Sequence, residues 1–84
     1  MEYLIAFSSF YKAIYAQEKL QERRVHATLK KLPPEVIKSC GYALYLRADS
    51  IQTIIDILNT AQITTKGVFV IDNSQGRTNY KRIA

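Results

Sequence analysis

The chain has one cysteine, Cys40, and its neighbours are residue types that can support thiol chemistry. It stands in the stretch Ser39-Cys40-Gly41, and Lys38 lies two residues before it. The thiolate is the nucleophilic form of cysteine, and a nearby cation or a helix N-terminus favours it over the neutral thiol. Glycine at position 41 lets the backbone approach closely or adopt a positive φ angle. Cys40 is therefore the candidate reactive group.

Four segments have the composition of β-strands, and two have the apolar spacing of amphipathic helices. The strand segments are rich in apolar, β-branched and aromatic residues, and they are residues 2–7, 25–32, 42–46 and 67–72. Apolar side chains recur at helical spacing in the other two, residues 10–24 and 51–61. Ser8 or Ser9 can cap the first helix, and Asp49 can cap the second, with Gln52 at the spacing of a capping box.

The resulting order of elements is β-α-β-β-α-β, the split arrangement of the ferredoxin-like fold. Right-handed crossovers place the third strand between the first and second, and the first strand between the third and fourth. We therefore predict an α+β domain with a four-stranded antiparallel sheet in the order 4-1-3-2 and both helices on one face. Residues 1–72 form this single domain, and residues 73–84 are predicted to be a basic, flexible C-terminal tail.

This topology brings Cys40 close to the N-terminus of the first helix. The third strand runs antiparallel to the first, so its beginning lies beside Ser8 and Ser9. Free backbone N–H groups and the helix dipole favour an anion there, and Lys38 adds a cation. Each effect is worth about 0.3–1 kcal/mol, which lowers a thiol pKa from ~8.5 to about 7–8. We expect a poised thiol, not a strongly acidic one.

Cys40 can equally be a small apolar residue in the core, as free cysteines often are. Pro33 and Pro34, together with Ser39 and Gly41, describe a shaped loop more than a core strand. On physical grounds alone the two interpretations are evenly balanced.

His26, the one histidine, is the obvious candidate for a base that activates Cys40. It starts the second strand, at the opposite end of the sheet, and five or six residues at ~3.3 Å each separate the two by roughly 15–20 Å. We therefore interpret His26 as an exposed residue on an edge strand. One cysteine and one histidine do not supply the four ligands of a structural zinc site, and we expect no metal or cofactor.

At KSCGYALYL the sequence resembles a family of small bacterial domains, the selenium/sulfur carrier-like proteins. The family pattern is a strand, a Ser/Thr segment opening a helix, a proline-containing loop, and Ser-Cys-Gly followed by a small residue and leucine. The matching stretches are IAFSSFYKA, KKLPPEVIKSCG and YALYL, and the resemblance covers residues 3–71. It implies a ferredoxin-like fold and a role for Cys40 as carrier of sulfur or selenium, held as a persulfide or selenosulfide.

The resemblance carries over to Cys40, with Ser39 and Gly41 as its loop, and it implies donor and acceptor proteins as partners. Ser8, Ser9 and Lys38 would stabilise the thiolate. Two features depart from the family pattern: the tail that begins at Asn73, and the bulky Tyr42 after Gly41. Tyr42 either limits access to the thiol or packs against the sheet, and its strand propensity favours packing. With the resemblance added, we interpret Cys40 as a working thiol.

Two other function classes stay open. An apolar, helix-free sheet face favours dimerisation through that face, as a structural or regulatory module, with or without a carrier role. Sheets of this topology can also bind RNA on exposed aromatic residues, here Tyr3, Phe7, Tyr42, Tyr45 and Phe69. The third strand lacks the RNA-binding signature, so nucleic acid is the weaker alternative. No phosphate loop, triad or carboxylate pair indicates a conventional enzyme.

Composition is that of one soluble globular domain, with 48% hydrophobic and 23% charged residues among 84. The net charge is +5, but residues 1–72 hold nine Lys and Arg against seven Asp and Glu. The rest of the excess lies in Arg77, Lys81 and Arg82 of the tail. We expect no membrane segment and no signal peptide, and a single cysteine offers no disulfide framework, which favours the reducing cytoplasm.

Overall fold

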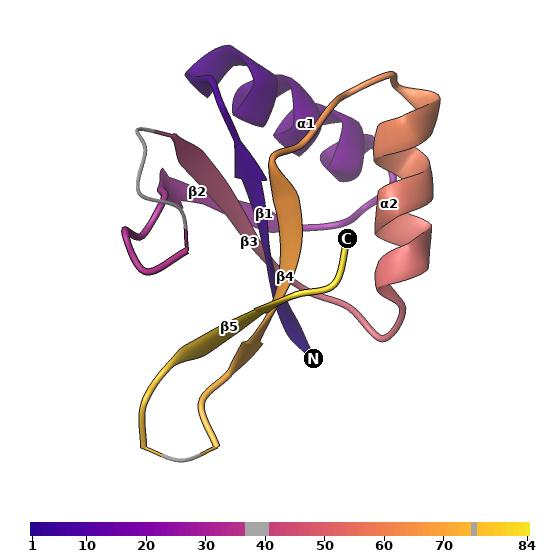
Figure 1. Cartoon of the computed structure of the whole chain (residues 1–84). Helices are drawn as coiled ribbons and strands as arrows, with labels where there is room; N and C mark the ends of the chain where they lie inside the picture. The colour runs from indigo at the N-terminus through magenta and orange to yellow at the C-terminus, as the bar shows by residue number, and fades with distance from the viewer. Residues whose placement is uncertain (37–40, 75) are drawn as a thin grey trace.

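A computed structural model of the chain describes residues 1–36, 41–74 and 76–84. The elements follow one another in the order β1–α1–β2–β3–α2–β4–β5. The strands are β1 (Glu2–Phe7), β2 (Ala27–Lys31), β3 (Tyr42–Arg47), β4 (Gly67–Asp72) and β5 (Asn79–Arg82), and the helices are α1 (Phe10–Glu22) and α2 (Ile51–Thr60). All strand pairs are antiparallel, in the order β2-β3-β1-β4-β5, and both helices cover one face of the sheet (Figure 1). The α+β class is confirmed.

The prediction of a four-stranded sheet is wrong, because part of the expected tail forms a fifth strand. β5 pairs with β4 from Phe69↔Arg82 to Asp72↔Asn79, and the N–H of Ile83 donates to the Val68 carbonyl at 2.8 Å. Residues 73–84 are therefore not an irregular tail over their whole length. The apolar alternation that identifies strands is absent from Asn79–Arg82, and backbone hydrogen bonds to β4 hold this edge strand instead.

The larger core lies between the sheet and the two helices. Tyr3, Ile5 and Phe7 of β1 point into it, because alternate residues of a strand face the same side. Facing them are small and aliphatic helix side chains, Ala13, Ala16, Leu20, Ile54 and Leu58. Burial of these apolar surfaces is the main force that holds both helices on the sheet.

The helix-free face has a smaller core of its own. Leu4, Ala6 and Ala43 on this face are fully buried, and Leu32, Phe69, Val36, Tyr45, Ile71 and Tyr80 complete the cluster. Burial, and then the neighbouring Tyr80, raise the pKa of Tyr45 to about 12. Within the described part of the chain this face is therefore not an exposed apolar surface. The reason for expecting dimerisation there is weakened accordingly.

The start of α2 also differs from expectation. Ser50, and not Asp49, is the N-cap, and its side chain makes no capping hydrogen bond. Gln52 donates from Nε2 to Oδ1 of Asp56 at 2.9 Å, along the helix, instead of completing a capping box. The spacing of residues 49 and 52 was compatible with a capping box, but the helix begins one residue later than that box requires.

Two residues after the end of each helix stands a residue in the left-handed region that is not glycine: Arg24 (φ 62°) after α1 and Gln62 (φ 58°) after α2. After α1, the N–H of Arg24 donates to the Gln21 carbonyl and that of Val25 to the Leu20 carbonyl, both at 2.9 Å. After α2, the N–H of Gln62 donates to the Asn59 carbonyl at 3.0 Å, and that of Ile63 donates to the Leu58 carbonyl at 2.9 Å. This is the Schellman motif, in which glycine is the usual left-handed residue.

We expect Arg24→Gly and Gln62→Gly each to raise the free energy of unfolding by up to about 1 kcal/mol. A left-handed residue other than glycine costs about 1–2 kcal/mol, and the flexibility of glycine in the unfolded chain offsets roughly 0.5–1 kcal/mol of the gain. Urea denaturation measures the change. Arg23→Gly is the matched control, because Arg23 has φ −100° and should only lose stability. Destabilisation by all three variants would contradict this account of the helix ends.

Candidate functional site

The candidate site lies where β1 ends and β3 begins. The sheet register pairs Phe7 with Tyr42, the residue after Gly41. The Gly41 backbone lies so close to β1 that an added Cβ would be 2.8 Å from the Phe7 carbonyl oxygen. The carbonyl of Gly41 also accepts a hydrogen bond from the N–H of Leu32 at 3.0 Å. Close backbone approach is therefore the reason that position 41 requires glycine.

Three of the predicted site residues, Lys38, Ser39 and Cys40, lie outside the residues that the structure describes. Gly41 is the described residue that directly follows them in the chain. The other predicted members, Ser8 and Ser9, are described, and they follow Phe7 directly in the chain.

Ser9 is the N-cap of α1, which settles the choice between the two serines. Its backbone is extended (φ −137°, ψ 153°), and its Oγ accepts a hydrogen bond from the N–H of Lys12 at 3.1 Å. Ser8 is exposed. The first turn of α1 contains no acidic residue, so its positive dipole end is not neutralised from within the helix. That end begins two residues after Phe7, whose carbonyl touches Gly41.

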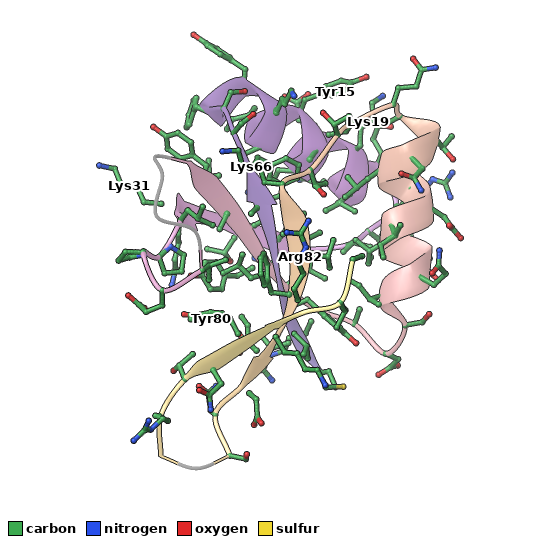
Figure 2. All side chains as sticks on the ribbon, viewed as in Figure 1. Tyr15, Lys19, Lys31, Lys66, Tyr80 and Arg82 are labelled. Atoms are coloured by element: carbon green, nitrogen blue, oxygen red, sulfur yellow. The ribbon has the colours of Figure 1, made fainter. Side chains whose placement is uncertain are left out.

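Lysines that the sequence analysis did not single out lie at the same end of the sheet. Lys31 is the last residue of β2 and is exposed, and the N–H of Lys66 donates to the Ala6 carbonyl at 2.7 Å. Lys12 is in the first turn of α1, and its Nζ donates to Oγ1 of Thr64 at 2.9 Å. Figure 2 shows Lys31 and Lys66 near the start of β3. These lysines are far apart in the sequence, so only the strand register could have placed them at the same end of the sheet.

The ring of Tyr42 packs against α1. It meets Phe10 edge to face, with 5.3 Å between the ring centroids, and the residue is half-buried at the margin of the larger core. Edge-to-face contact is a favourable arrangement for two aromatic rings. Packing therefore accounts for this bulky residue directly after the glycine.

His26 lies far from this end. It is exposed and directly precedes β2, whose first residue, Ala27, pairs with Leu46, whereas its last residue pairs with Tyr42. The length of the strand therefore separates His26 from Gly41, in agreement with the predicted topology. Across the described ranges, no group of three or more His, Cys, Asp or Glu side chains is arranged to hold a metal ion, and no helix has the length and apolarity to span a membrane.

Comparison with known proteins gives one family match. The family model described as "Putative Se/S carrier protein-like" matches residues 2–70. The matched span ends within β4, so β5 lies beyond it. No curated protein and no solved structure matches the chain.

The two N-cap serines give a matched pair of variants. We expect Ser9→Ala to lower the free energy of unfolding by about 1 kcal/mol, because it removes the bond to the Lys12 N–H. Ser50→Ala should change it by less than about 0.5 kcal/mol, since that side chain makes no capping bond. Equal losses in the two variants, measured by urea denaturation, would contradict the assignment of Ser9 as the effective cap.

Proposed function

The chain belongs to the "Putative Se/S carrier protein-like" family, and from this membership we propose that Cys40 carries a sulfur or selenium atom between two proteins. The observation that supports this role best is the contact of Gly41 with the Phe7 carbonyl, directly before α1. Cys40 is bonded to Gly41, and consecutive Cα atoms are about 3.8 Å apart. Gly41, the residue that follows Cys40 in the chain, thus lies beside the positive end of a helix.

The transfer is an exchange of sulfur–sulfur bonds. Cys40 loses its proton to solvent, and its thiolate attacks the outer sulfur of a persulfide on the donor protein. A new S–S bond forms as the donor's S–S bond breaks, and the donor cysteine leaves as a thiolate that takes up a proton. A thiolate of the acceptor protein then removes the outer sulfur in the same way. One bond forms for each that breaks, so no oxidant or reductant is consumed, and selenium moves likewise through an S–Se bond.

The charges around Gly41 suit such a thiolate. The first turn of α1, capped by Ser9, has no acidic residue, and Lys12, Lys31 and Lys66 lie at this end of the sheet. Ser8, Ser9 and Lys38 add to this stabilisation of the thiolate. A cation at the protein surface contributes little alone, about 0–1 kcal/mol. Together these groups favour the thiolate, which is the form of cysteine that attacks in exchange.

We infer that β1 to β4 and the two helices form a ferredoxin-like unit, to which β5 is added at the edge. Ser39 and Gly41 shape the loop that presents Cys40 to donor and acceptor proteins. The reducing cytoplasm is the compartment in which a lone carrier thiol stays available for exchange.

Persulfide loading tests this function. After incubation with glutathione persulfide and removal of excess reagent, the intact protein should gain the mass of one sulfur atom, and dithiothreitol should remove it. Cys40→Ser should gain nothing, and circular dichroism checks that this variant is folded. A second, thiol-containing acceptor protein should then recover the sulfur. Absence of loading on the folded wild-type chain, or equal loading of Cys40→Ser, would refute the carrier role.

A further inference from the structure

A groove of about 740 Å³ lies at the end of the sheet opposite Gly41, where β2 begins and β3 ends. Its walls come from the turn before β2, the end of β3 and the start of α2. This volume lies in the range of small-molecule sites, about 300–1,000 Å³. Arg47, in the groove at the end of β3, lies six residues from Gly41, roughly 20 Å at ~3.3 Å each. The groove extends along β2 as far as Lys30, which pairs with Ala43, but its two arginines lie at the end of the sheet away from Gly41.

Basic side chains from separate elements line this groove. They are Arg24, His26, Lys30 and Arg47, and two carboxylates, Glu2 and Asp49, share the lining. Both arginines are exposed, so their guanidinium groups can meet a ligand from solvent. The planar guanidinium fork matches the oxygens of a phosphate and binds them in pairs. Three full positive charges against two negative ones favour an anion over a cation.

The start of α2 forms another wall. Ser50 and Thr53 line the groove, and the Ser50 side chain makes no capping hydrogen bond. The first turn of α2 holds no acidic residue. At α1, by contrast, the Ser9 hydroxyl already occupies the N–H of Lys12. The amide groups of the first turn of α2 therefore have no side-chain cap from Ser50 on this wall of the groove.

The remaining lining favours a small organic ligand over a nucleic-acid strand. Apolar side chains contribute to the groove, namely Val25, Leu46, Ala48 and Ile54. Tyr45 is the aromatic residue of the lining, but the Lys30 ammonium lies 5.2 Å from its ring centroid. The ring is thus occupied and does not offer an open stacking surface of the kind that RNA-binding sheets use. The negative charges of Glu2 and Asp49 would also repel the continuous phosphate backbone of a nucleic acid.

We propose that this groove binds a small organic phosphate, with its phosphate group held by Arg24, Arg47 and the start of α2. The organic part lies against the apolar lining. A phosphomonoester the size of a nucleoside monophosphate fits both the groove and the arrangement of charges. This site gives the chain a ligand that takes no part in the chemistry of Cys40.

Amide NMR spectra of the full chain, titrated with AMP, adenosine and inorganic phosphate, test the proposal. AMP should shift the resonances of residues 24–26 and 47–54 in a saturable way, inorganic phosphate should shift the same set more weakly, and adenosine should leave them unchanged. Arg24→Gly should weaken AMP binding at least about tenfold, because it removes a charged hydrogen-bond donor. Glycine suits the left-handed backbone at this position, so the variant should stay folded.

Gln62→Gly is the matched control, because it makes the same backbone change away from the groove and should bind AMP like the wild type. Unshifted resonances at millimolar AMP, or equal AMP affinity of Arg24→Gly and wild type, would overturn the proposal. Tighter binding of oligouridine than of AMP, increasing with its length, would overturn it in favour of a nucleic-acid site. Cys40→Ser should bind AMP unchanged, so the outcome is separate from that of the carrier test.

Discussion

The antiparallel pairing of β1 with β3 is the constraint on which the other features depend. β1 is central in the sheet and is buried on both faces, with Leu4 in one core and Ile5 in the other. A slip of one residue would exchange these faces, so burial on both sides holds the register firmly. That register sets Phe7 opposite Tyr42, and it thereby brings Gly41 against β1 immediately before α1 begins.

The same pairing separates the starts of the two helices. α1 follows β1 and α2 follows β3, and because these strands run in opposite directions, the two helices begin at opposite ends of the sheet. The start of α1 lies beside Gly41, where lysines gather and Ser9 caps the helix. The start of α2 lies in the groove with Arg24 and Arg47. One small domain thus has a helix N-terminus at each end of its sheet, one beside Gly41 and one in the groove.

Local patterns were sufficient to predict the core elements but not the edges. The apolar run at residues 2–7 and the helical stripes correctly predicted a buried strand and two helices on one face. β5 escaped prediction because Asn79–Arg82 shows no alternation, and its backbone bonds to β4 have no sequence signal. The left-handed backbone of Arg24 and the position of the lysines near Gly41 were not predicted for a related reason. Both depend on how segments that are distant in the sequence pack together. The choice of Cys40 as candidate carrier rests on residue type and family resemblance, since it lies outside the residues that the structure describes.

The rate of Cys40 alkylation against pH, measured by mass on the native chain, tests the central claim most directly. The Cys40→Ser variant, which lacks the thiol, gives the background labelling. A working thiolate beside the α1 N-terminus should react rapidly, with a midpoint clearly below the value of about 8.5 that an ordinary cysteine shows. A midpoint at or above that value, or labelling that appears only after denaturation, would contradict the account and identify Cys40 as a packing residue.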